Sequence, residues 1–100
     1  MSNLELAEVS DFMKCFSNPL RLNIILTLEE GEKPVNEIVE ETGAKQCYVS
    51  QQLNYLTLRN ILERRSEGHH VYYSLKMKNV VSMLELVDHE FTHDNILEKV

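Results

Sequence analysis

The stretch VNEIVEETGAKQCYVSQQLNYL, residues 35–56, contains two short segments in which apolar residues recur at helical spacing. Gly43 separates them, and a glycine just after a helical pattern is typical of a helix C-terminus because it adopts left-handed backbone angles without strain. The second segment begins two residues later. Two short helices joined by a tight, glycine-containing turn form a helix-turn-helix, which we predict over about residues 35–59.

The second helix of this motif has a face made almost entirely of neutral polar side chains. Its apolar residues Val49, Leu53 and Leu56 fall at i, i+4 and i+7, which predicts one buried stripe. Around them the chain carries amides, serine, cysteine and two tyrosines, and only Lys45 is charged. A solvated helix usually carries charged residues on its outer face, so this face is suited to hydrogen bonding with a partner.

A β-hairpin is predicted after the motif, over about residues 61–75. Apolar and polar residues alternate along His70–Leu75, as in a half-buried strand, and ILERRS supplies the partner strand. The sequence SEG, residues 66–68, predicts the turn between them. The basic side chains expected to gather at the tip of this hairpin are Arg64, Arg65, His69 and His70.

Three further helices are predicted around these elements. One begins at Asn18, a favourable N-cap, with Pro19 in the first helical position. Two others are amphipathic and lie at the ends of the chain, over about residues 4–16 and 77–98. A single small domain spanning residues 1–100 buries little apolar surface, so we expect these terminal helices to form a dimer interface.

The composition excludes several classes of protein. With 43% hydrophobic and 26% charged residues, the chain is an ordinary globular domain. Its longest apolar run has three residues, so we expect no membrane span. The N-terminal segment carries acids and no basic region, and the two cysteines form no disulfide framework, which favours a reduced, cytoplasmic protein. No phosphate-binding loop or catalytic motif is present, so we expect no enzyme.

Charge is distributed unevenly along the chain. The formal net charge is −6, which argues against a polyanionic partner. Residues 44–78, however, hold six basic and two acidic residues, a net charge of +4, and they include the second helix of the motif and the hairpin. A locally basic face can collect phosphates while an acidic remainder limits non-specific adhesion.

A helix-turn-helix followed by a basic hairpin is the winged-helix arrangement, mainly α with a small β-hairpin. Amides and hydroxyls can bond base edges in the major groove, and hairpin arginines are suited to the phosphate backbone. We therefore predict double-stranded DNA as the partner. The candidate contacts are Lys45, Gln46, Cys47, Tyr48, Ser50, Gln51, Asn54, Tyr55, Arg64, Arg65, His69 and His70. The alternative is a winged-helix module that contacts only proteins, which the acidic total charge favours.

Three blocks of the sequence resemble the ArsR/SmtB family of winged-helix repressors. They are NPLRLNIILTL, GAKQCYVSQQLNYL and ILERRSEGHHVYYSL, at residues 18–28, 43–56 and 61–75. The resemblance covers about residues 12–91. It implies a homodimer, held by the first and last helices, that represses its own operon from a palindromic operator until an inducer binds. Relatives often carry serine and histidine at the positions of Cys47 and Gln51, so base preference does not carry over.

The resemblance also implies positions for a metal effector, and this chain departs from them. The family's site on the last helix corresponds to Met77, Asn79, Glu90 and His93, of which methionine and asparagine are poor zinc ligands. A second family site uses a Cys-x-Cys pair in the third helix, which has no cysteine here. His89 and His93, spaced i, i+4, are the remaining candidate metal ligands, and solvated histidines are the alternative.

The two cysteines are candidate effector-sensing residues of another kind. Cys47 falls in the first turn of the predicted recognition helix, where the helix dipole and Lys45 favour a thiolate. Cys15 falls near the end of the first helix and is either a second, resolving thiol or a bystander. The inducer is thus predicted to be a thiol-reactive species or a metal ion, and the sequence leaves both open. Two unrelated small side chains are the remaining interpretation.

Overall fold

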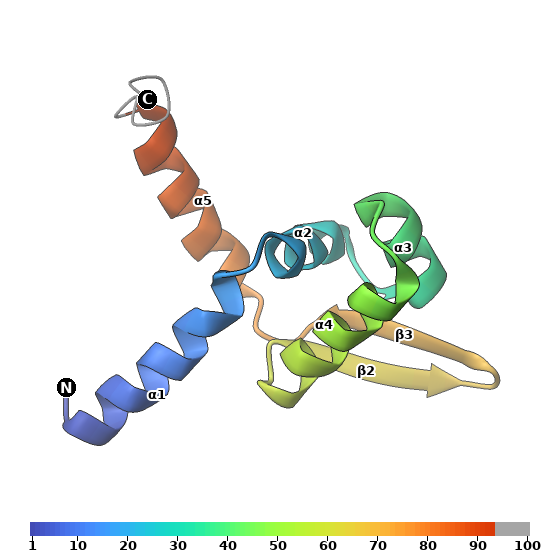
Figure 1. Cartoon of the computed structure of the whole chain (residues 1–100), viewed down its shortest axis with the longest axis horizontal. Helices are drawn as coiled ribbons and strands as arrows, with labels where there is room; N and C mark the ends of the chain where they lie inside the picture. Colours follow the sequence, from blue (N-terminus) through green and yellow to red (C-terminus); the bar gives the residue numbers. More distant parts are fainter. Residues whose placement is uncertain (94–100) are drawn as a thin grey trace.

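The computed structural model describes the backbone of residues 1–93 and the side chains of residues 1–92. The predicted continuation of the last helix to about residue 98 lies outside these residues. The elements, in chain order, are α1 (Asn3–Met13), a 3-10 turn (Lys14–Phe16), α2 (Pro19–Thr27), a 3-10 turn (Leu28–Glu30), β1 (Lys33–Pro34), α3 (Val35–Thr42), α4 (Gln46–Leu58), β2 (Leu62–Glu67), β3 (His70–Leu75) and α5 (Asn79–His93). The predicted winged helix-turn-helix fold is confirmed (Figure 1).

The helices α2, α3 and α4 pack together and, with the base of the sheet, enclose the core. The predicted stripe of α4 is fully buried, with Val49, Leu53 and Leu56 each at 0% exposure. It meets Ile24 and Ile25 of α2, which are also fully buried. Because this stripe fixes which side of α4 faces the core, it also fixes which side faces outward.

Local sequence signals determine where the helices of this body begin and end. The side chain of Asn18 caps α2 by accepting hydrogen bonds from the amides of Leu20 (2.9 Å) and Arg21 (3.1 Å). Gly43 ends α3 with a φ of 70°, a left-handed angle that glycine adopts without strain. The short turn that follows sets α4 at an angle to α3 (Figure 1).

The sheet has three antiparallel strands in the order β1-β3-β2, one more than the sequence analysis predicted. The additional strand is β1, in which Lys33 pairs with Tyr73 and Pro34 with Tyr72. Lys33 is buried, and its ammonium donates hydrogen bonds to Glu41 (2.6 Å) and Glu30 (3.0 Å). The bond to Glu41 raises the pKa of Lys33, which keeps this buried side chain charged.

The turn of the hairpin lies at Gly68 and His69, so the turn predicted at residues 66–68 was placed too early and only its Gly68 was correct. Ser66 pairs with Val71 and Glu67 with His70, so both belong to the ladder. Gly68 has a φ of 61°, and a glycine with positive φ at the first central position is typical of a type II′ turn. The hairpin spans residues 62–75, close to the predicted 61–75, and we refer to β2, β3 and this turn as the wing.

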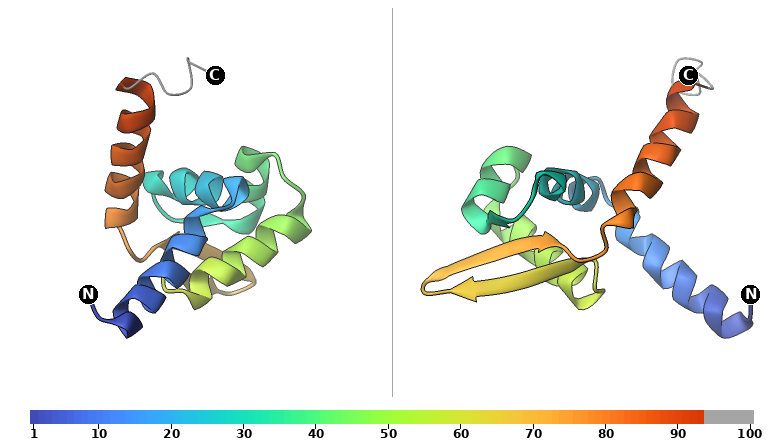
Figure 2. Two further views of the ribbon diagram at one scale, coloured as in Figure 1. Left: turned by 60° about the vertical axis from the view of Figure 1, so that its left-hand side comes forward. Right: turned by 180° about the vertical axis from the view of Figure 1, so that it is seen from behind.

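The terminal helices extend away from the body in diverging directions (Figures 1 and 2). No residue of α1 is buried, and Leu6, Val9 and Met13 are 52%, 42% and 50% exposed. In α5 the first turn packs on the core through Val80 and Val81, Leu84 is partly buried against it, and Val87 and Phe91 farther along are open to solvent. Among the described residues, no helix has the length and apolarity needed to cross a bilayer.

Candidate nucleic-acid interface

The outward face of α4 is mainly polar over its first three turns, and Leu58 is exposed at its end. Gln46, Cys47, Ser50, Gln51 and Asn54 are all exposed, on the side opposite the buried stripe. Tyr48 is 53% exposed, and Lys45 occupies the N-cap position without a capping hydrogen bond from its side chain. None of these side chains forms a hydrogen bond or ion pair with residues 1–92, so their donors and acceptors are available to a partner.

Tyr55 does not belong to this outward face, in contrast to the sequence prediction. It is half-buried and packs against the core. The guanidinium carbon of Arg21 lies 3.8 Å from its ring centroid, and that of Arg59 lies 4.8 Å away. Nε of Arg21 also donates to Oε1 of Gln52 (2.7 Å), one turn before Tyr55. The flank of α4 therefore carries two stacked arginines that the sequence analysis did not identify.

The two wing arginines lie on opposite faces of β2, because successive residues of a strand alternate. Arg64 is four residues before the turn and donates one hydrogen bond, to Ser66 (3.2 Å). The expected cluster of Arg64 and Arg65 at the tip was therefore wrong. Only His69 and His70 lie at the tip, where both are exposed.

Arg65 is engaged by carboxylates. Its guanidinium donates to Glu32 (2.7 Å from Nη2) and to Glu67 (2.5 Å from Nη1), and it stacks 4.6 Å from the centroid of Tyr72. The bond to Arg65 lowers the pKa of Glu32, and the bonds to Glu32 and Glu67 raise the pKa of Arg65. One positive and two negative charges leave this group with a net negative charge. Arg65 is thus less suited to a phosphate than the sequence suggested.

A small hollow of about 280 Å³ lies between the wing tip and the helix-turn-helix. His69 and His70 line it from the wing, Gln46 from the start of α4 and Asn36 from α3. The fold therefore brings predicted contacts of the wing and of the recognition helix to one surface, although they are more than twenty positions apart in sequence.

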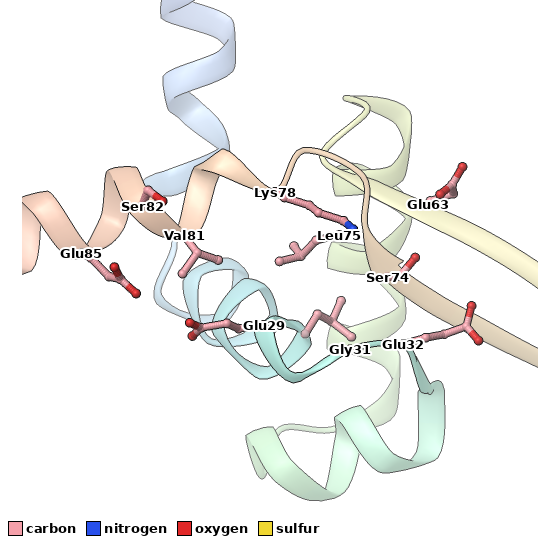
Figure 3. A pocket seen from close by; sticks show the side chains of 11 residues that line it. Glu29, Gly31, Glu32, Glu63, Ser74, Leu75, Lys78, Val81, Ser82 and Glu85 are labelled. Carbon is pink, nitrogen blue, oxygen red and sulfur yellow. The ribbon is translucent and has the colours of Figure 1, made fainter.

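A larger hollow of about 530 Å³ lies between α5, the wing and the end of α2 (Figure 3). Its polar lining is acidic, with Glu29, Glu32, Glu63 and Glu85 around a single cation, Lys78. These carboxylates repel phosphate, so this side of the molecule is not suited to DNA.

The candidate effector residues lie in different surroundings. Cys47 is exposed and Cys15 is fully buried, and both are free thiols. His89 is exposed in α5, whereas the side chain of His93 lies outside the described residues. Within residues 1–92, no group of three His, Cys, Asp or Glu side chains is placed to hold a metal ion.

The comparisons with known proteins agree with this geometry. The model of the family described as "Bacterial regulatory protein, arsR family" matches residues 18–63, which include the helix-turn-helix. The biofilm growth-associated repressor of Xylella fastidiosa is 38% identical over 68 residues, which cover 68% of this chain and 60% of the relative. The repressor of the same name from Agrobacterium fabrum is 31% identical, covering 78% of this chain and 67% of the relative.

A solved structure extends the similarity to most of the chain. It is the homodimeric winged helix-turn-helix DNA-binding domain Mb0332 from Mycobacterium bovis, described as a possible regulator of the same family. The sequences are 28% identical, the TM-score is 0.78, and the match covers 90% of this chain and 89% of that one. The chain nevertheless spans only about 60% of the length of the curated Xylella relative.

Proposed function

Because this chain belongs to the ArsR family of bacterial regulatory proteins, we propose that it is a DNA-binding transcriptional regulator, a homodimeric repressor that an inducer releases from a palindromic operator. The observation that carries the proposal is the outward face of α4. It presents unpaired amides and a hydroxyl on a helix whose other side is anchored in the core. These groups match the donors and acceptors on base edges in the major groove.

The exposed apolar residues of α1 and α5 support the homodimer. Val87 and Phe91 continue the stripe of α5 away from the body and are 46% and 41% exposed, and α1 exposes a similar stripe. Two projecting helices with such stripes can bury them against a second copy. A two-fold dimer presents two recognition helices, which we expect to read half-sites about one helical turn, ~10 bp, apart or a multiple of that.

For the inducer we propose two candidates. The first is a thiol-reactive species acting at Cys47, which the exposure of this thiol at the start of α4 supports. The second is a metal ion held by His89 and His93 on α5, which would act through the dimer interface and would need further ligands. The two candidates predict responses to different reagents.

The experiment that tests the function is selection of bound sequences from a pool of randomised duplexes, followed by affinity measurement on the selected duplex and on random DNA. We expect a palindromic consensus and much tighter binding to it than to random DNA. If the dimeric protein bound neither at low salt, the DNA-binding proposal would fail and a module that contacts only proteins would be favoured.

A first prediction concerns base recognition. Gln51→Ala or Ser50→Ala should weaken binding to the selected operator by roughly 1–3 kcal/mol and leave random DNA nearly unchanged, because a base contact carries sequence choice. Asn23→Ala, at an exposed position of α2, is the control and should change neither affinity. Equal losses on both duplexes would remove these residues from base recognition.

A second prediction separates the two wing arginines by their partners. Arg64→Ala should weaken all DNA sequences and reduce the slope of log affinity against log salt by about 0.9, the loss of one phosphate contact. Arg65→Ala should leave this slope close to that of the unmodified protein, because Glu32 and Glu67 already neutralise the guanidinium. Titration of a random duplex at several salt concentrations measures both. A slope change for Arg65→Ala as large as that for Arg64→Ala would contradict this separation of the two arginines.

A further inference from the structure

The flank of α4 next to the outward face carries a cluster formed by Tyr55, Gln52, Arg21 and Arg59. Arg21 extends from α2, donating from Nε to Gln52 (2.7 Å) and from Nη1 to the main-chain carbonyl of Lys14 (2.8 Å), and it lies over the ring of Tyr55. Arg59 follows Tyr55 by one turn and lies over the same ring. Two cations from different helices therefore converge on one aromatic side chain.

Neither guanidinium is neutralised within residues 1–92. Arg21 and Arg59 form no ion pair there with any carboxylate, whereas Arg65 forms two. Stacking on a ring attracts a guanidinium through its face and uses none of its N–H donors. Nη2 of Arg21 and the whole fork of Arg59 thus keep their donors for another acceptor. The protein is acidic overall, yet these two arginines are held in place without a paired carboxylate. We therefore expect a partner to supply the anion that they bind.

If α4 lies in the major groove of DNA, the position of the cluster places it beside the phosphates of the DNA backbone. A helix with its side chains is about 10–12 Å wide and the major groove is about 12 Å wide, so a recognition helix fills the groove. Its outward face then meets the bases and its flanks meet the phosphate walls. Tyr55 and Arg59 lie on such a flank, and Arg21 reaches it from α2.

We propose that Arg21 and Arg59 form a phosphate-binding site for the DNA backbone along the flank of α4, with Tyr55 and Gln52 as the positioning residues. This inference rests on the proposed DNA-binding function and deepens it. The contact is independent of sequence and fixes the register of the recognition helix. Some of the phosphate contacts that the sequence analysis assigned to the wing are thus made by α2 and α4.

The test is the salt dependence of binding to a short random-sequence duplex. Arg59→Ala should reduce the slope of log affinity against log salt by about 0.9 for one lost phosphate contact, and Arg21→Gln should reduce it similarly. Arg59→Lys keeps the charge and should keep most of the slope. Arg65→Ala is the matched control, because Arg65 is also stacked on a tyrosine but is paired with two carboxylates. Thermal unfolding of each variant, followed by circular dichroism, checks its fold.

A second measurement locates the phosphate. Single phosphates of the selected operator are replaced in turn by neutral methylphosphonates, and each duplex is titrated with the unmodified protein and with Arg59→Ala. We expect at least one replacement that weakens the unmodified protein and has no further effect on Arg59→Ala, because both changes remove the same contact.

The outcomes distinguish the two levels of the proposal. If the protein binds DNA but Arg59→Ala keeps the full slope and is additive with every methylphosphonate, the phosphate site is overturned and the DNA-binding function stands. If Arg59→Ala and Arg65→Ala reduce the slope equally, the effect is one of net charge and the site is likewise overturned. If the unmodified protein binds no DNA at low salt, both proposals fail.

Discussion

Replacing Val87 or Phe91 of α5 with glutamate is expected to convert the protein into a monomer and to lower its affinity for the selected operator by about 10²–10⁴-fold. Both residues lie in the stripe of α5 that projects beyond the core, and they are 46% and 41% exposed in the single chain. Burying a carboxylate in an apolar interface costs several kcal/mol, which is enough to separate two small subunits. A monomer engages one half-site and loses the gain from binding two at once.

Sedimentation at micromolar concentration measures the first part of this expectation, and titration of the operator measures the second. The unmodified protein should sediment at about twice the mass of the chain. Ser82→Glu is the control, because it adds the same charge to the same helix at an exposed position outside the stripe. A monomeric unmodified protein, or a dimeric Phe91→Glu variant with full affinity, would contradict the proposed interface.

A bulky adduct on Cys47, such as a mixed disulfide with glutathione, is expected to reduce operator binding to the level of random DNA, a loss of at least about 10³-fold. Cys47 is exposed in the first turn of α4, next to Gln46 and Ser50 on the face assigned to the bases. An adduct there adds bulk to a helix that already fills the groove, and glutathione adds negative charge near phosphates. No long-range conformational change is required.

Operator affinity is measured with mild oxidant, polysulfide, arsenite and zinc in turn. Cys47→Ser should abolish the response to the thiol reagents. Cys15→Ser should retain it, because the Cys15 thiol is fully buried and shielded from these reagents. A thiol response that persists unchanged in both variants would rule out this model. A zinc response that is lost in His93→Ala would instead favour the metal site on α5.

The parts of the fold that the sequence predicted are those set by neighbouring residues. Asn18 and Pro19 mark the start of α2, and Gly43 ends α3, because capping depends on residues within one turn. The stripe of Val49, Leu53 and Leu56 identified the buried side of α4, and the outward face followed from it. The family resemblance rested on the same segments and is confirmed by the family model.

The parts that it missed depend on partners distant in the chain. Arg65 is paired with Glu32, 33 positions away, and no local pattern indicates that pair. Tyr55 was assigned to the DNA face because its position in the helical repeat lies outside the buried stripe. In the structure Arg21, from α2, stacks on its ring, and the two form a cluster on the flank of α4. The hairpin turn was misplaced because Ser66 and Glu67 are common turn residues, and only the register with β3 assigns them to the strand.

The short strand β1 limits how such a molecule can be switched. Pro34 pairs with β3 and also precedes the first turn of α3, and buried Lys33 joins the same point to Glu41 of α3. The wing is thereby tied to α3, the first helix of the helix-turn-helix, and α3 packs in turn against α4 within one core. What can change is the distance between the two DNA-binding bodies of a dimer, which is set at the points where α1 and α5 leave each body. We therefore expect an inducer acting through α5 to shift the preferred half-site spacing by a base-pair step, with each half-site still read in the same way.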